Sequence, residues 1–143
     1  MVAAILICLT LVLLTSLIHF ETLTWLSRWL PRSALPRRQL VLAGLLGLFA
    51  AHAVEVFLYG MAYALLARWA GHGALGLGVA GFDTALYFSA ESYTSLGLGD
   101  LAPVGPMRML AGVEALNGLL LIAWSASFMY LQMERYWKPV NGE

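Results

Sequence analysis

Three long apolar stretches are the feature that most restricts the fold of this chain. They run from about Val2 to Phe20, from Leu40 to Leu66 and from Met109 to Met133. Each is close to the roughly 20 residues that a helix needs to cross the hydrocarbon core of a bilayer. The chain is 61% hydrophobic and 11% charged, whereas a soluble domain carries about a quarter charged residues. The sequence therefore predicts an all-α membrane protein with three transmembrane helices.

The connection between the first two stretches, residues 21–39, predicts the orientation. It carries four arginines, and basic connections stay on the cytoplasmic side. The N-terminus is then outside and the tail, residues 134–143, is cytoplasmic. We expect residues 1–20 to be a retained span, because a basic start and a cleavage site are missing, and residues 21–30 to lie flat on the inner leaflet. The compact chain favours the inner membrane of a bacterium.

A short apolar segment precedes the third span. Residues 82–93 are compatible with a helix that is too short to cross a bilayer, so we expect a re-entrant helix with Asp83 as its N-cap. The glycines at alternate positions in the following segment, Thr94–Asp100, allow φ > 0 and suit a ribbon whose carbonyls face one axis. Non-helical backbone at membrane depth survives only when it is buried or lines water. Together these segments predict a pore loop.

The block from Tyr87 to Val104 resembles, without a gap, the pore-helix and filter block of the potassium channel superfamily, in particular its bacterial members. The resemblance covers about residues 40–133 and leaves the first span as an addition. It implies a homotetramer, because one filter strand per chain cannot encircle an ion. It also implies an outer helix at 40–66, a pore helix at 82–93, a filter at 94–100 and an inner helix at 109–133.

The family's filter reads T-V-G-Y-G, and Ser95-Leu96-Gly97-Leu98-Gly99 occupies that place here. The resemblance implies that carbonyls of Ser95, Leu96, Gly97 and Leu98, with the Ser95 hydroxyl, coordinate dehydrated K⁺. Leu98 lacks the ring whose hydroxyl bonds the pore helices, and Phe88 replaces a common tryptophan. We expect these two residues to form an apolar cuff. K⁺ selectivity is the favoured interpretation; the alternatives are a weakly selective monovalent cation channel or a non-conducting membrane subunit.

Two carboxyl groups flank the expected filter. Glu91 lies behind it and Asp100 at its outer end, which matches a carboxyl pair of some bacterial relatives. Close carboxyls in a poorly hydrated place share one proton. We therefore expect a protonated Glu91 to bond Asp100, with Tyr87 as a further donor. The alternative is that Glu91 only faces solvent near the mouth.

The resemblance also assigns roles on the third span. Gly118 aligns with the hinge glycine of the inner helix, although glycines also serve helix packing in membranes. Four helically spaced residues are expected to face the cavity and its cytoplasmic exit, with the last as the gate. They are Leu119, Ile122, Ala126 and Tyr130.

Three ionisable residues at membrane depth are not explained by the resemblance. His52 and Glu55 share one helix face, and Glu114 lies near the outer end of the third span. They form either a pH-sensing cluster or, as we favour, a hydrogen-bonded set that holds the outer helix to the inner helix. The alternative for Glu114 is a pair with Arg108 or with the pore helix of a neighbouring subunit. His19 is expected at the cytoplasmic interface.

The sequence also disfavours several classes of function. Net charge is zero and there is no basic patch for nucleic acid. Cys8 is the single cysteine, and no Cys/His cluster with zinc spacing occurs. No catalytic Ser/His/Asp set or P-loop supports an enzyme. The expected partners are lipid and other copies of the chain, with K⁺ as permeant ion and no cofactor or soluble partner.

Overall fold

The computed structural model describes residues 2–69 and 81–137, and these residues contain helices but no strand. The prediction of an all-α protein is therefore confirmed for the part of the chain described. The elements are α1 (Val2–Trp29), a 3₁₀ turn η1 (Leu30–Arg32), α2 (Arg37–Trp69), α3 (Phe82–Tyr93) and α4 (Met107–Trp137).

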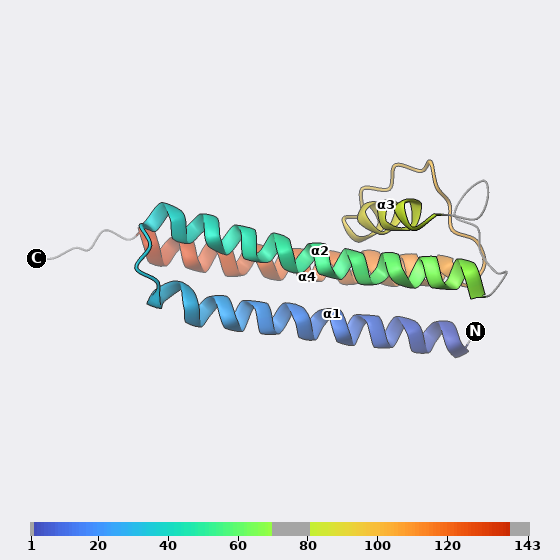
Figure 1. Ribbon diagram of the computed structural model, residues 1–143, viewed down its shortest axis with the longest axis horizontal. Coiled ribbons are helices and arrows are strands. Elements are labelled where there is room, and N and C mark those ends of the chain that lie inside the picture. Colours follow the sequence, from blue (N-terminus) through green and yellow to red (C-terminus); the bar gives the residue numbers. More distant parts are fainter. Residues whose placement is uncertain (1, 70–80, 138–143) are drawn as a thin grey trace, which may run out of the picture.

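Three long helices lie side by side and alternate in direction (Figure 1). The turn after α1 and the end of α4 lie at one end of the bundle, while the N-terminus and α3 lie at the other. All three are long and apolar enough to cross a membrane: Val2–Arg32, Arg37–Arg68 and Met107–Tyr136. The chain is a multi-pass membrane protein.

The first helix is longer than the sequence led us to expect. It continues past Phe20 to Trp29 as one element, so residues 21–29 extend the span and do not form a separate segment flat on the membrane. Two features explain the difference. Proline first occurs at Pro31, inside η1, and Leu23 and Leu26 are buried in a cluster with residues of α2. Packing of these two leucines against α2 therefore stabilises the helix beyond Phe20.

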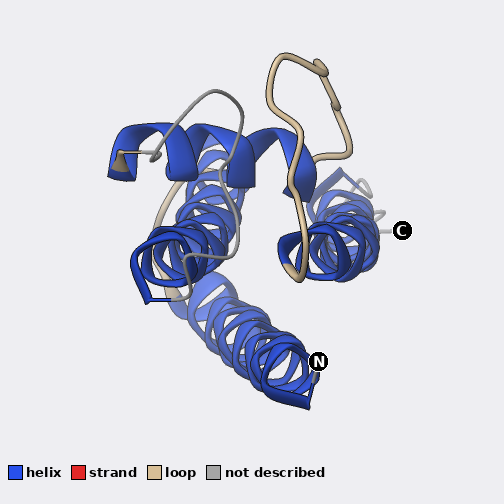
Figure 2. Cartoon of the chain, turned by 90° about the vertical axis from the view of Figure 1, so that its right-hand side faces the viewer, coloured by secondary structure: helices blue, strands red, loops and turns tan. Residues whose placement is uncertain are grey.

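The short helix α3 lies across α2 and α4 at one end of the bundle (Figure 2). Its bounds agree with the expected helix, but its N-cap is Gly81 and no side chain caps it. Asp83 lies instead in the first turn, where its negative charge interacts favourably with the positive end of the helix dipole. Close packing on α2 depends on Gly60, where a Cβ would lie 3.1 Å from the Leu86 Cα.

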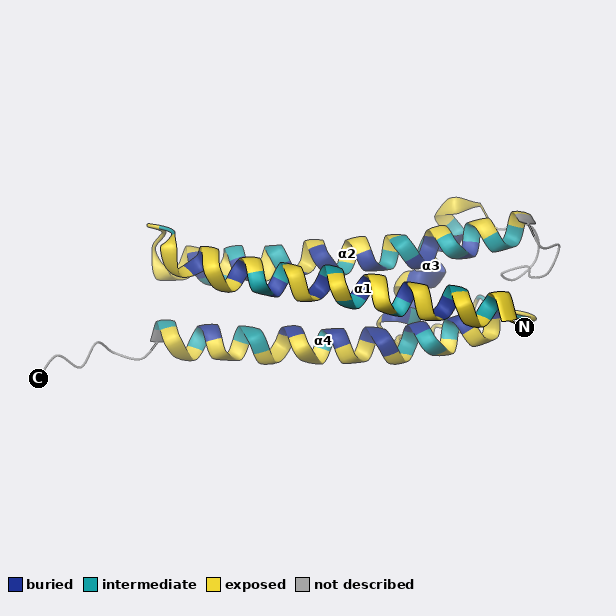
Figure 3. Cartoon of the chain, turned by 90° about the horizontal axis from the view of Figure 1, so that it is seen from below, coloured by how far each residue is buried: buried dark blue, intermediate teal, exposed yellow. Residues whose placement is uncertain are grey.

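Polar side chains, not only apolar ones, fill the centre of the bundle. Much of the outer surface is exposed in a single chain (Figure 3), which suits contact with lipid or with further copies. The buried polar and charged residues lie between the helices and are Thr15, His19, Glu55, Ser89, Glu91, Glu114, Asn117, Ser125 and Gln132. Polar side chains in membrane proteins form hydrogen bonds that hold helices together.

One of these bonds joins all three spans. The side-chain amide of Asn117 in α4 donates to the Thr15 Oγ1 in α1 at 2.8 Å and to the Tyr59 hydroxyl in α2 at 3.2 Å. Thr15 in turn donates to the Leu11 carbonyl of its own helix. The amide therefore attaches α1 to the pair formed by α2 and α4.

We expect Asn117→Ala and Thr15→Val to destabilise the fold non-additively, with a coupling free energy of about 0.5–2 kcal/mol, because both remove the same interhelical bond. A double-mutant cycle on unfolding of the purified protein in detergent measures this coupling. Ser127→Ala is the matched control on α4, since the Ser127 hydroxyl bonds only the Ala123 carbonyl of its own helix. Strict additivity of the two substitutions would contradict the role given to Asn117.

Candidate functional site

The loop after α3 begins as the C-terminal cap of that helix. The Ser95 amide donates to the Ser92 carbonyl at 3.0 Å, and the Leu96 amide donates to the Glu91 carbonyl at 2.9 Å. This pair of bonds, with Ser95 at φ = 56°, is a Schellman motif, which usually has glycine at the left-handed position. The end of α3 therefore sets the direction in which the loop leaves.

Positive φ then recurs at every second residue of the loop. Ser95, Gly97 and Gly99 have φ of 56°, 58° and 82°, which is the conformation that the glycine spacing led us to expect. Among the residues that the structure describes, none has an atom within 4 Å of a Cβ added to Gly97 or Gly99. Backbone conformation, and not space, is thus what requires glycine there. Ser95 adopts the same region at a cost of about 1–2 kcal/mol.

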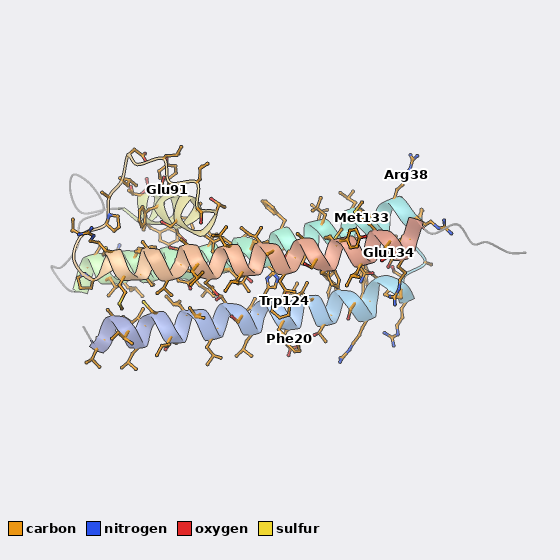
Figure 4. The ribbon with its side chains drawn as sticks, turned by 180° about the vertical axis from the view of Figure 1, so that it is seen from behind. Phe20, Arg38, Glu91, Trp124, Met133 and Glu134 are labelled. Atoms are coloured by element: carbon orange, nitrogen blue, oxygen red, sulfur yellow. The ribbon has the colours of Figure 1, made fainter. Side chains whose placement is uncertain are left out.

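Glu91 holds the loop from behind. Its side chain is buried, and its Oε2 accepts the Leu98 amide at 3.1 Å (Figure 4). The expected donor to the outer carboxylate is present, since the Tyr87 hydroxyl lies 3.1 Å from the Asp100 Oδ2. No hydrogen bond joins Glu91 to Asp100 within the described chain. In the single chain Glu91 is thus buried from solvent and bonded to the backbone of the loop, and a proton shared with Asp100 stays a prediction.

The two halves of the expected apolar cuff lie in different surroundings. Phe88 is buried, edge-on against Tyr63 of α2 at 5.0 Å between ring centroids. Leu98 is 59% exposed. Within one chain, Phe88 anchors α3 to α2, and a cuff that includes Leu98 stays a prediction for an assembly of chains.

Gly118 marks the closest approach of α4 to α3. A Cβ at this position would lie 2.1 Å from the Tyr93 carbonyl oxygen. Glycine is thus required for packing at Gly118, and its role as a hinge stays a prediction. The expected cavity residues further along α4 lie on a face that the chain itself leaves largely uncovered, with Leu119, Ala126 and Tyr130 exposed and Ile122 partly buried.

A buried polar cluster lies beneath the end of α3. The Glu55 carboxylate faces His19 Nδ1 at 3.0 Å and His52 Nδ1 at 3.1 Å, and it accepts a short hydrogen bond from the Tyr93 hydroxyl. Ser125 Oγ lies 3.2 Å from His19 Nε2 and 3.0 Å from His52 Nε2. We call these five residues the Glu55 cluster. It joins α1, α2, α3 and α4.

The cluster differs from the set that the sequence predicted. His52 and Glu55 are bonded as expected, but Glu114 lies apart and accepts the Tyr63 and Ser89 hydroxyls, both at 2.5 Å. His19 is fully buried, not interfacial. It was placed at the interface because the first span was ended at Phe20; a helix that continues to Trp29 puts His19 well inside the bundle.

Ser125 and Tyr93 were also missed as members of the cluster. Neither residue is unusual in its own stretch of sequence, and each is recognisable only by the groups that it meets from other helices. A search for polar residues on the inward face of α4 would have found Ser125. Only the packing of α3 across α2 brings Tyr93 to Glu55.

Comparison with known proteins agrees with a pore-forming arrangement. The model of a family described as "Ion channel" matches residues 51–135. The inward rectifier potassium channel Kirbac3.1 of Paramagnetospirillum magnetotacticum is 38% identical over 62 residues, which is 43% of this chain and 20% of the relative. The chain thus spans about a fifth of that relative's length. No solved structure matches.

We expect Gly118→Ala to destabilise the protein, although alanine is the better helix former by about 1 kcal/mol. The added methyl meets backbone, and overpacking of this kind costs about 1–3 kcal/mol. Gly112→Ala is the matched control on α4, because a Cβ there meets no atom of the described residues within 4 Å. Thermal unfolding of both variants in detergent decides the matter. An equal rise in the midpoint for both would show that α4 and α3 are not in close contact.

Proposed function

The chain belongs to the ion channel family, and on that premise we propose that it is a potassium-selective channel with Thr94–Asp100 as its filter. One observation carries the proposal most directly. Positive φ at Ser95, Gly97 and Gly99 is the alternation that allows successive carbonyls to be presented to one axis. Backbone carbonyls so arranged replace the hydration shell of a cation.

The proposed coordinating atoms are the carbonyls of Ser95, Leu96, Gly97 and Leu98, with the Ser95 hydroxyl. A single strand provides one oxygen per level, so four copies around one axis are needed to enclose the ion. Exposure supports this assembly, since residues 94–100 are all exposed in the single chain. K⁺ is then the permeant ion, with lipid and other copies of the chain as partners.

The proposed pathway continues along α4. Leu119, Ile122, Ala126 and Tyr130 line the cavity and its exit, and Tyr130 narrows the exit as an apolar gate. Uncovered side chains on this face of α4 support the assignment. Gly118 lies next to the filter end of this pathway.

The proposed orientation places the arginine-rich turn in the cytoplasm. Arg28 lies in the last turn of α1, Arg32 ends η1, and Arg37 and Arg38 begin α2. The end of α4 lies at the same end of the bundle, so the positive-inside rule puts the C-terminal end in the cytoplasm and the N-terminus outside. The inner membrane of a bacterium is the proposed location, with residues 40–133 as the pore domain.

A weakly selective cation channel is the second candidate. The observation that favours it is the exposed Leu98 side chain, because it offers no hydroxyl to brace the filter from outside. A non-conducting membrane subunit is the third possibility. Measurements of K⁺ and Na⁺ flux distinguish these two candidates from each other and from the potassium-selective channel.

We expect purified protein in liposomes to pass K⁺ in strong preference to Na⁺, and Gly99→Ala to abolish the K⁺ flux. Alanine resists φ = 82°, at a cost of about 1–2 kcal/mol in each subunit. Fluorescent flux assays under opposed K⁺ and Na⁺ gradients give both results. Gly112→Ala is the control and should conduct normally, since a Cβ there has no neighbour within 4 Å in the described part of the chain.

Each alternative has its own outcome in this assay. Equal K⁺ and Na⁺ permeability that Gly99→Ala removes would establish the weakly selective channel. Absence of flux in wild-type protein that is folded and assembled would establish the non-conducting subunit.

We further expect Glu91→Gln to keep most of the flux and Glu91→Leu to lose at least about tenfold. The amide carbonyl of glutamine accepts the Leu98 N–H as the carboxylate does, whereas leucine leaves that donor unpaired at a cost of about 1–3 kcal/mol. Equal flux in the two variants would overturn this role for Glu91. Asp100→Asn serves as a control for loss of charge alone near the filter.

A further inference from the structure

We propose that His19, His52 and Glu55 bind one transition-metal ion of the zinc class in each subunit, with the Tyr93 hydroxyl as a fourth oxygen. One ligand atom from each of the first three residues lies within 4.8 Å of the other two. The residues come from α1 and α2, and Tyr93 comes from α3. This inference goes beyond ion conduction, and metal binding does not require that the protein conducts ions.

The donor chemistry suits Zn²⁺. Two imidazoles, one carboxylate and one phenol oxygen form an N₂O₂ set, and Zn²⁺ accepts nitrogen and oxygen ligands in a tetrahedron. Zinc–ligand bonds of about 2.0–2.2 Å place neighbouring ligands about 3.3–3.5 Å apart. The Glu55 oxygens lie 3.0 and 3.1 Å from the two Nδ1 atoms, and the Tyr93 hydroxyl lies 2.9 Å from His52 Nδ1. Small rotations of these side chains increase the distances between the ligand atoms to those of a tetrahedral zinc site.

The hydrogen atoms available at Ser125 fit a positive charge on the Nδ1 side of the two rings. If both Nδ1 atoms donate to Glu55, both neutral rings present a bare Nε2 to Ser125, whose hydroxyl has one hydrogen to give. One of the two contacts then lacks a hydrogen atom. If a metal ion occupies the Nδ1 side, both Nε2 atoms carry hydrogen and both donate to Ser125 Oγ, which has two lone pairs. A bound metal ion therefore satisfies both contacts at Ser125, as one extra proton on either ring also does, and the Co²⁺ titration below distinguishes the two.

Ser125 would then act as an outer partner of the ligands. Ligating histidines characteristically donate their other ring N–H to an oxygen that orients the ring. Here one hydroxyl serves both rings, at 3.2 and 3.0 Å. The Trp124 ring also lies 5.5 Å from the His19 ring, and Figure 4 labels it between α4 and α1. These neighbours hold His19 in place.

Charge favours the same occupant. A carboxylate with two neutral imidazoles leaves one negative charge inside an apolar bundle, where charge is costly. A divalent cation, with Tyr93 bound as its phenolate after release of the hydroxyl proton, brings the net charge of the site to zero. Glu114 of α4 is also buried, and its partners are the Tyr63 and Ser89 hydroxyls, which leaves it outside the ligand set.

An entry route reaches His52. Its side chain is 21% exposed and lines a hollow of about 460 Å³ with Ile122, Ser125 and Ala126. It also lines a hollow of about 370 Å³ that includes Tyr93 and Thr94. Ile122 and Ala126 belong to the proposed pathway, so entry from the central cavity rests on the proposed function.

Co²⁺ titration of the purified, chelator-treated protein in detergent tests the proposal without measuring ion flux. We expect one Co²⁺ per chain, with the intense visible absorption of tetrahedral Co²⁺, and full displacement by Zn²⁺. No binding, or only the weak spectrum of octahedral Co²⁺, would overturn the proposal. Failure here would leave the flux results untouched, so the two proposals fail separately.

Variants locate the site. His19→Gln, His52→Gln and Glu55→Gln should each weaken binding more than about a hundredfold, and Ser125→Ala by about 10- to 100-fold. Glu114→Gln is the matched carboxyl control, and His72→Gln, outside the described residues, is the histidine control; both should bind as wild type does. Wild-type affinity in the first three variants would refute the site. Should those variants aggregate, the Ser125→Ala affinity and the wild-type spectrum still decide.

Discussion

The Glu55 carboxylate is the group on which the arrangement of the helices most depends. It is fully buried, and a carboxylate at membrane depth is tolerated only with partners. Its partners come from three elements: His19 from α1, His52 from α2 and Tyr93 from α3. Ser125 adds α4 through both histidines. A shift of any one helix along its neighbours would separate these groups, so the partners of one carboxylate connect all four helices.

Residues of the Glu55 cluster are also connected to the loop that follows α3. Tyr93 bonds Glu55 through its hydroxyl, and its carbonyl abuts Gly118 of α4. The next residues start the loop through the Schellman motif, and Glu91 accepts the Leu98 amide further on. A site built on rigid elements and supported from behind keeps its geometry better than a free loop. The added first helix thus contributes, through His19, to a cluster that supports the loop.

Much of the fold follows from local properties of the sequence. Length and hydropathy predict the three spans and the short helix, because the length of an apolar helix determines whether it can cross a bilayer. Alternate glycines predict the positive φ values of the loop. The helix limits were less predictable: α1 runs on to Trp29 because Leu23 and Leu26 bury against α2, and that contact is not local. The N-cap also differed from the prediction, since α3 begins at Phe82 and Gly81 precedes it.

The sequence by itself determined that this chain is a three-span helical membrane protein with a glycine-spaced loop between two of its spans. Those features depend on residues close together in the chain. Only the tertiary structure decided that His19 belongs with His52 and Glu55, that Glu114 stands apart, and that Glu91 bonds Leu98 and not Asp100. The partners of a buried polar group are whichever donors the packed helices bring near, and no local pattern records them.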